Sequence, residues 1–130
     1  MKLANCTFSV DRVQPTNMGW AYAIVIGNSD YSGCTQRPKV NLSRATRHSD
    51  LVATLLEDCK VKVYKFNDAK REEILDIFLQ LYQKSVKDKK AGFVPMILIY
   101  YSGYGYIKNN QRWIEFNNDV EPLNLDACVR

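Results

Sequence analysis

The sequence has little of several residues and motifs on which common kinds of active site depend. It contains one histidine, His48, and four scattered cysteines with no CxxC pair. This spacing fits neither a zinc site nor a disulfide framework, so we expect free thiols in a reducing cytosol, with no metal and no other cofactor. The sequence also has no GxGxxG or P-loop motif, which argues against a nucleotide-binding loop.

Long apolar runs and a strong charge excess are also lacking. Every apolar run is far shorter than the roughly 18 residues of a membrane span. Residues 1–13 have no apolar core of signal-peptide length. We therefore expect a cytoplasmic protein without a membrane partner. The net charge of +4 is mild and its basic residues are dispersed, so nucleic acid is not an expected partner either.

The composition is that of a globular chain. Of the 130 residues, 46% are hydrophobic and 25% are charged, which suits a single folded domain better than a disordered segment. Residues 1–19 show no clear period. We therefore expect an irregular arm at residues 1–19, followed by one domain at residues 20–130.

Three stretches have the pattern of β-strands. Residues 20–26 (WAYAIVI) and 96–101 (MILIYY) are almost entirely apolar or aromatic, which predicts strands buried on both faces. Residues 61–66 (VKVYKF) alternate, which predicts a half-exposed strand at an edge of the sheet. Two short β-like runs around Asn109-Asn110 predict a hairpin.

Two helices are predicted between these strands. Residues 42–58 have apolar residues at helical spacing, with Ser43 as the expected N-cap. A second helix is expected after Asn67-Asp68, which we take as its cap. Its predicted apolar stripe consists of Ile74, Ile77, Phe78, Leu81 and Tyr82. The alternation of strands and helices predicts an α/β fold, a three-layer αβα sandwich with a mainly parallel central sheet.

The candidate site directly follows the run at residues 96–101, where Gly103 and Gly105 bracket Tyr104. Glycines at the end of a strand allow a sharp turn that exposes the residue between them. In open α/β sheets this carboxyl edge is where ligands usually bind. Ser102 is a weaker candidate because no GxSxG motif surrounds it, and His48 is expected to lie half-exposed on a helix.

Four segments together resemble the caspase-like clan, and paracaspases and metacaspases most closely. They are AYAIVIGNSDY, DLVATLLEDCKVKVYKFND, AKREEILDIFLQL and ILIYYSGYGY. In those families the first strand ends in IGN-x-x-Y and the third in YSGHG or YAGHG. The resemblance runs from about residue 22 to residue 116. It implies the large-subunit half of a caspase-like fold, a cysteine endopeptidase ancestry, and a role in apoptosis or immune regulation.

The resemblance also implies a catalytic dyad, in which the histidine of SGHG assists a cysteine thiolate. Tyr104 occupies the histidine position, and Gly103 and Gly105 would lie in the oxyanion loop. A phenol with a pKa of about 10 cannot shuttle protons near neutrality as an imidazole of about 6.5 does. Cys128, in LDACVR, is similar to the family's cysteine in L-D-x-C-R. However, it follows Tyr104 too closely for a crossover helix and a parallel strand.

These features leave more than one interpretation of function open. The first is a catalytically inactive caspase-like domain, a pseudoenzyme that acts on a protein partner or a second copy through an exposed sheet edge. The alternative is an active cysteine endopeptidase, with Cys128 as its nucleophile or with a completing subunit. A third is a fragment or splice form that ends before the catalytic strand.

Overall fold

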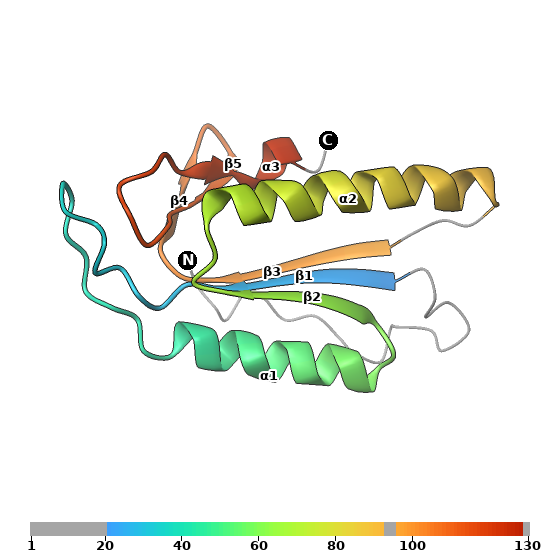
Figure 1. Cartoon of the computed structure of the whole chain (residues 1–130), viewed down its shortest axis with the longest axis horizontal. Helices are drawn as coiled ribbons and strands as arrows, with labels where there is room; N and C mark the ends of the chain where they lie inside the picture. The colour runs from blue at the N-terminus through green and yellow to red at the C-terminus, as the bar shows by residue number, and fades with distance from the viewer. Residues whose placement is uncertain (1–20, 93–95, 129–130) are drawn as a thin grey trace.

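The computed structural model describes residues 21–92 and 96–128, so the arm expected at residues 1–19 lies outside the described residues. The described chain forms the predicted three-layer sandwich (Figure 1). Its central layer is a parallel sheet in the order β2-β1-β3, made of β1 (Ala21–Gly27), β2 (Lys62–Asn67) and β3 (Met96–Ser102). Helix α1 (Ala45–Asp58) covers one face of this sheet, and helix α2 (Arg71–Lys90) covers the other.

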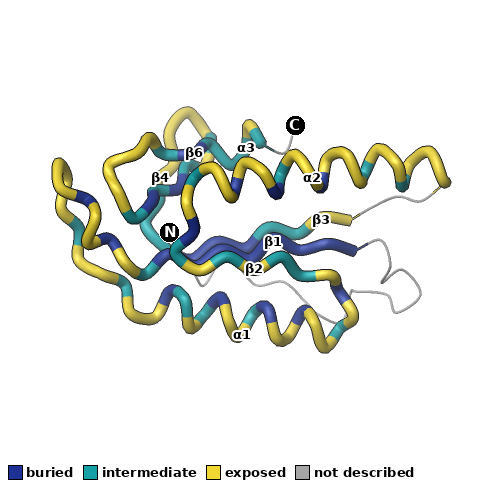
Figure 2. Tube along the Cα trace, viewed as in Figure 1, coloured by how far each residue is buried: buried dark blue, intermediate teal, exposed yellow. Residues whose placement is uncertain are grey.

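Strand β1 is the centre of the core, because it has a parallel neighbour on each side and a helix on each face. All seven of its residues are buried (Figure 2). Tyr22, Ile24 and Ile26 belong to the core cluster beneath α2, whereas Ala23 and Val25 belong to the cluster beneath α1. The predicted buried strand at residues 20–26 is therefore confirmed over its described part.

The prediction that β3 is buried on both faces was wrong for its first half. The exposed fraction is 50% for Met96 and 40% for Ile97, and burial is complete only from Tyr100 onward. Among the described strands, β3 pairs with β1 alone and so lies at an edge, where its first residues are exposed. Strand β2 lies at the other edge, as its alternating pattern predicted.

Both predicted helix caps were also wrong. Helix α1 begins at Ala45 after Arg44, and it is the hydroxyl of Ser29, not Ser43, that accepts a hydrogen bond from the amide of Thr46 (2.9 Å). Asp68 does not cap α2. At the N-terminus of α2, the carboxylate of Glu73 accepts a hydrogen bond from the amide of Lys70 (3.2 Å). At α1 a distant residue, Ser29, takes the place of the expected cap. At α2 the carboxylate of Asp68 instead accepts from the amides of Ser29 and Asp30, and a residue of the helix itself, Glu73, provides the local contact.

The apolar stripe of α2 was predicted correctly in its centre and wrongly at one position. Ile74, Ile77 and Leu81 are buried, and Phe78 packs against the same cluster. Tyr82 is instead 63% exposed and belongs to a different face of the helix.

The predicted hairpin is confirmed as β4 (Gly105–Lys108) and β5 (Gln111–Ile114). Asn109 and Asn110 have φ angles of 54° and 61°, the left-handed values that a two-residue type I′ turn requires. Strand β5 also pairs with β6 (Leu123–Asn124), which leads into the short helix α3 (Leu125–Cys128). This second sheet and α3 lie on the α2 side of the sandwich (Figure 1).

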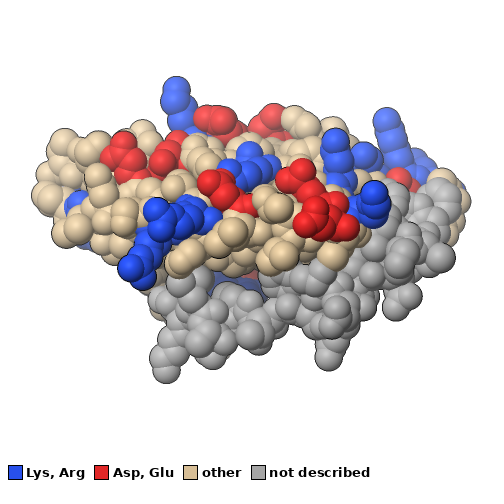
Figure 3. Space-filling view, turned by 90° about the horizontal axis from the view of Figure 1, so that it is seen from below, with Lys and Arg blue, Asp and Glu red and all other residues tan. Residues whose placement is uncertain are grey.

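On the α1 side of the sandwich, neither charge predominates among the described residues that are visible in Figure 3. Figure 3 shows lysine, arginine, aspartate and glutamate side chains interspersed there. Within the same part of the chain, no helix is long and apolar enough to cross a membrane.

Candidate functional site

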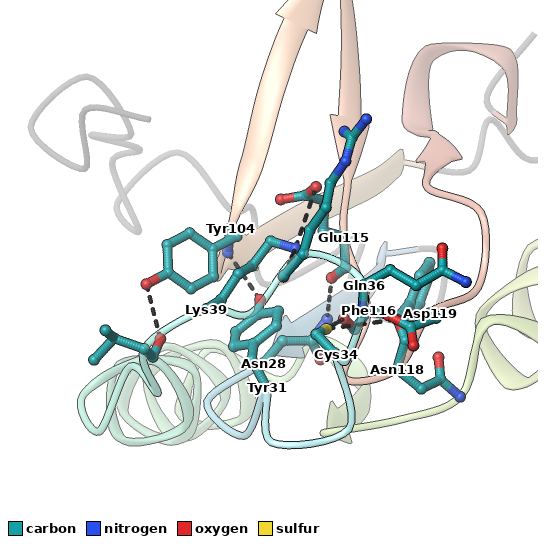
Figure 4. A network of polar contacts seen from close by, with 12 residues as sticks. Asn28, Tyr31, Cys34, Gln36, Lys39, Tyr104, Glu115, Phe116, Asn118 and Asp119 are labelled. Atoms are coloured by element: carbon teal, nitrogen blue, oxygen red, sulfur yellow. Dashed lines mark hydrogen bonds and ion pairs between the residues drawn. The ribbon is translucent and has the colours of Figure 1, made fainter.

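The candidate site lies at the carboxyl edge of the parallel sheet, where Tyr104 follows β3 in the turn into β4 (Figure 4). Two other segments meet it there. One is the loop after β1, which includes Asn28 and Tyr31. The other begins with Glu115, directly after β5, and is joined to the first through the side chain of Asn28. Tyr104 thus lies at the carboxyl edge of the sheet, where its flanking glycines led us to expect it.

The backbone of Tyr104 is held by the hydroxyls of two buried tyrosines. Its amide N–H donates to Oη of Tyr31 (2.8 Å), and its carbonyl accepts from the hydroxyl of Tyr101 (2.6 Å). The two phenol oxygens lie 3.3 Å apart. A hydrogen bond from Tyr31 to Tyr101 completes a cycle in which every donor has an acceptor. We call this arrangement the tyrosine cycle.

The tyrosine cycle is excluded from solvent, with exposed fractions of 1% for Tyr31 and 7% for Tyr101. Burial raises the pKa of Tyr31. Burial also raises the pKa of Tyr101, and the neighbouring Tyr31 raises it further. Both phenols therefore stay protonated near neutral pH. The hydroxyl of Tyr31 accepts from the amide of Tyr104 and that of Tyr101 donates to its carbonyl, so the two together position the backbone of Tyr104.

The glycines around Tyr104 are required by close packing. A Cβ atom on Gly103 would lie 2.4 Å from Oη of Tyr101 and 2.7 Å from Oη of Tyr31. A Cβ atom on Gly105 would lie 2.6 Å from the backbone oxygen of Trp113 across the hairpin. The first glycine thus makes room for the tyrosine cycle, and the second lets β4 pair with β5.

The side chain of Tyr104 turns toward the loop after β1. Its ring packs edge-on against the ring of Tyr31, with a centroid distance of 4.7 Å and an interplanar angle of 72°. Its hydroxyl donates to the backbone oxygen of Val40 (2.8 Å). The phenol is therefore engaged in a structural contact, although Tyr104 as a whole is only half-buried.

Further hydrogen bonds fix the segments around the site. The side-chain amide of Asn28 donates to the backbone oxygen of Glu115 (3.0 Å), and the amide of Glu115 donates to the carbonyl of Tyr104 (3.1 Å). The backbone of Asn28 bonds to the carbonyl of Ser102, whose exposed fraction is only 4%. Burial in this position argues against Ser102 as a nucleophile.

A separate group of hydrogen bonds, which we call the Asp119 clamp, holds the loop after β1 against the segment after β5 (Figure 4). The carboxylate of Asp119 accepts hydrogen bonds from the amides of Thr35 (3.0 Å) and Gln36 (3.2 Å) and from the hydroxyl of Thr35. Its bonds to the Thr35 hydroxyl and the Gln36 amide are the main causes that lower the pKa of Asp119. The buried thiol of Cys34 donates to the backbone oxygen of Phe116 (3.3 Å). Cys34 is thus a packed side chain in this clamp.

Cys128 lies apart from these contacts, at the end of α3. It packs against the core cluster that α2 covers. Burial raises the pKa of its thiol, and the nearby Arg71 opposes that shift only in part. Since the thiolate is the nucleophilic form, a raised pKa leaves Cys128 poorly activated near neutral pH. Among the described residues, no hydrogen bond or ion pair joins Cys128 to Tyr104, whose side chain instead contacts Tyr31 and Val40.

His48 lies half-buried in the first turn of α1, where its backbone N–H donates to the carbonyl of Arg44. In the described part of the chain, no group of three histidine, cysteine, aspartate or glutamate residues could hold a metal ion.

Sequence reasoning missed three residues of the site: Asn28, Tyr31 and Tyr101. The motif IGN-x-x-Y contains both Asn28 and Tyr31, so the segment itself carried a usable signal. Tyr101 was hidden in an apolar run, since a tyrosine there is as consistent with packing as with hydrogen bonding.

We predict that Tyr101→Phe lowers the free energy of unfolding by about 1–3 kcal/mol, because the hydroxyl of Tyr31 then loses its buried acceptor. Urea denaturation followed by circular dichroism measures this change. Tyr31→Phe is expected to have a similar effect, and the double variant should lose less than the sum of the two. Tyr106→Phe is the matched control, because that exposed tyrosine lies outside the cycle. Equal effects at Tyr101 and Tyr106 would contradict the cycle.

Comparison with known proteins gives one family assignment. No curated protein and no solved structure matches the chain. The family described as Caspase domain matches residues 21–130, a stretch that includes every helix and strand described above. The chain therefore belongs to the caspase domain family.

Proposed function

We propose that this caspase domain is catalytically inactive and acts by binding a protein. The observation that carries the proposal is the state of Tyr104. It occupies the strand-end position at which the resemblance to YSGHG places the dyad histidine, and its hydroxyl donates to the backbone oxygen of Val40. A phenol held in this way does not take up and release protons near neutral pH as an imidazole does. The sequence contains no other candidate base of this type, because its only histidine, His48, lies on α1.

The state of the candidate nucleophile supports the same proposal. A cysteine peptidase requires its thiolate within hydrogen-bond reach of the base. Cys128 packs instead against the core cluster, at the end of α3, which follows the hairpin. Neither half of a cysteine–histidine dyad is therefore in place around Tyr104.

We predict that the wild-type domain does not cleave fluorogenic peptides ending in arginine or aspartate, and that Tyr104→His does not gain this activity. An imidazole at residue 104 would restore the base but would not bring Cys128 to it. Cys128→Ala is the control in both backgrounds. Cleavage by the wild type would overturn the proposal of inactivity. Cleavage by Tyr104→His that Cys128→Ala abolishes would contradict the separation of the two residues.

We also predict that iodoacetamide alkylates Cys128 more slowly at pH 7 than it alkylates a cysteine in an unstructured peptide. The raised pKa means that less thiolate is present at this pH, and the rate should increase as the pH rises toward that pKa. Mass spectrometry of the peptide that contains Cys128 measures the rate. Unfolding the protein in urea should remove the difference. A faster reaction in the folded protein would indicate an activated thiolate.

The exposed edge of β3 is the surface that we propose for protein binding. Among the described strands it pairs on one side only, and Met96 and Ile97 are exposed there. An unpaired apolar edge favours the addition of an extended segment from another chain. The opposite edge, β2, exposes Lys62 and Lys65, and lysines on an edge strand discourage such pairing.

We predict that Ile97→Lys abolishes binding of a protein segment at this edge, because a charge would have to be buried against the added strand. The test is to cross-link purified wild-type and variant domains to their binding proteins and compare the cross-linked peptides by mass spectrometry. Ile107→Lys is the matched control, since Ile107 is more exposed but lies on the hairpin. Cross-links from β3 that persist in Ile97→Lys would contradict the edge as the binding surface.

A further inference from the structure

Helix α2 has a second apolar face that the core does not use. Leu75, Leu79, Tyr82 and Val86 have exposed fractions of 38%, 55%, 63% and 36%. They are separated by four, three and four residues, which is the spacing of the a and d positions in a coiled coil. We call these four side chains the outer seam of α2.

The outer seam points away from the sandwich. The residues of α2 that enter the core are Ile74, Ile77 and Leu81, and at 100° per residue these fall on a different side of the helix from the outer seam. Figure 2 shows α2 as a largely exposed helix whose buried positions recur at intervals. The free face of a surface helix is normally polar, so an apolar stripe between charged residues indicates an interaction surface.

The outer seam is flanked by residues of opposite charge, each three positions from the nearest seam residue. Glu72 lies three residues before Leu75, and Lys89 lies three residues after Val86. Both are exposed. The helix as a whole has the same polarity, with acidic residues in its first turn and basic residues in its last.

The apolar and charged residues along this face of α2 are complementary to those of a second α2 that runs in the opposite direction. From Glu72 to Lys89 the spacings are three, four, three, four and three, so the order is the same from either end. A two-fold axis through the midpoint places Leu79 opposite Tyr82 of a second copy, and Glu72 opposite its Lys89. A parallel arrangement would instead place glutamate against glutamate and lysine against lysine. We propose that two copies of this chain pair through the outer seam of α2, antiparallel about a two-fold axis.

The rest of the structure holds α2 in place for such a contact. Its inner face is fixed in the core, and near its C-terminus the carboxylate of Asp88 accepts a hydrogen bond from the hydroxyl of Tyr22 on β1 (2.7 Å). The outer seam is therefore presented on a rigid element, and pairing requires no rearrangement of the domain.

The size of the outer seam sets the expected affinity. At 1.5 Å per residue it is about 25 Å long. A single pair of helices buries less than the roughly 1,200–2,000 Å² of a standard stable interface. We therefore expect a weak dimer, with a dissociation constant on the order of micromolar or above.

Sedimentation equilibrium of the full chain over a wide concentration range tests the proposal, with Glu72→Lys, Lys89→Glu and the double exchange. In an antiparallel dimer each single change creates two like-charge contacts, so dimerisation should weaken by about tenfold. The double exchange restores two attractive contacts and should return the dissociation constant close to that of the wild type. Any loss of α2 stability caused by Glu72→Lys is also present in the double variant, so recovery cannot arise from folding.

Lys87→Glu is the matched control, because it makes the same change in the last turn of α2 but away from the outer seam, and it should leave dimerisation unchanged. Leu79→Asp should abolish it. A chain that stays monomeric at every concentration overturns the proposal, as does a double exchange that fails to recover. A dimer that is lost in Ile97→Lys but kept in Leu79→Asp is paired through β3 and also overturns it. None of these outcomes bears on peptidase activity, so this proposal and that of inactivity can fail separately.

Discussion

The tyrosine cycle is the interaction on which the geometry of the site depends. It ties three segments together: the loop after β1 through Tyr31, the end of β3 through Tyr101, and the turn that carries Tyr104. Buried donors and acceptors cost about 1–3 kcal/mol each when they lose their partners, so this network resists rearrangement. The turn that carries Tyr104 is consequently held in place by these hydrogen bonds.

The loop after β1 extends this constraint to both helices of the sandwich. Ser29 bonds through its hydroxyl to the first turn of α1, and its amide, like that of Asp30, donates to the carboxylate of Asp68, before α2. Asn28 connects the same loop to the segment after the hairpin. The carboxyl edge of the sheet is therefore the region where all layers are bonded together.

The parts of the fold that depend on local pattern could be predicted from the sequence, and those that depend on distant partners could not. The type I′ hairpin at Asn109-Asn110 and the buried strand β1 follow from nearby residues alone. The order of the strands does not, so β3 was wrongly predicted to be buried along its whole length. Ser29, which caps α1, lies well outside the helix that it caps. The location of Tyr104 was predictable from its flanking glycines, but its contact with Tyr31 joins residues 73 positions apart.

The misplacement of Tyr82 has a specific cause that bears on function. A helix with one apolar face gives one stripe, but α2 has two, and Tyr82 of the second face was assigned to the first. The two proposed surfaces lie on different parts of the sandwich, since α2 covers a face of the sheet whereas β3 lies at its edge (Figure 1). A dimer joined through α2 would therefore leave the β3 edge of each copy accessible. Two linked edges bind a partner that has two binding segments more tightly than either edge does alone, because the second contact forms at high effective concentration. Weak self-association at α2 would thus strengthen weak binding at β3 without any new contact at that edge.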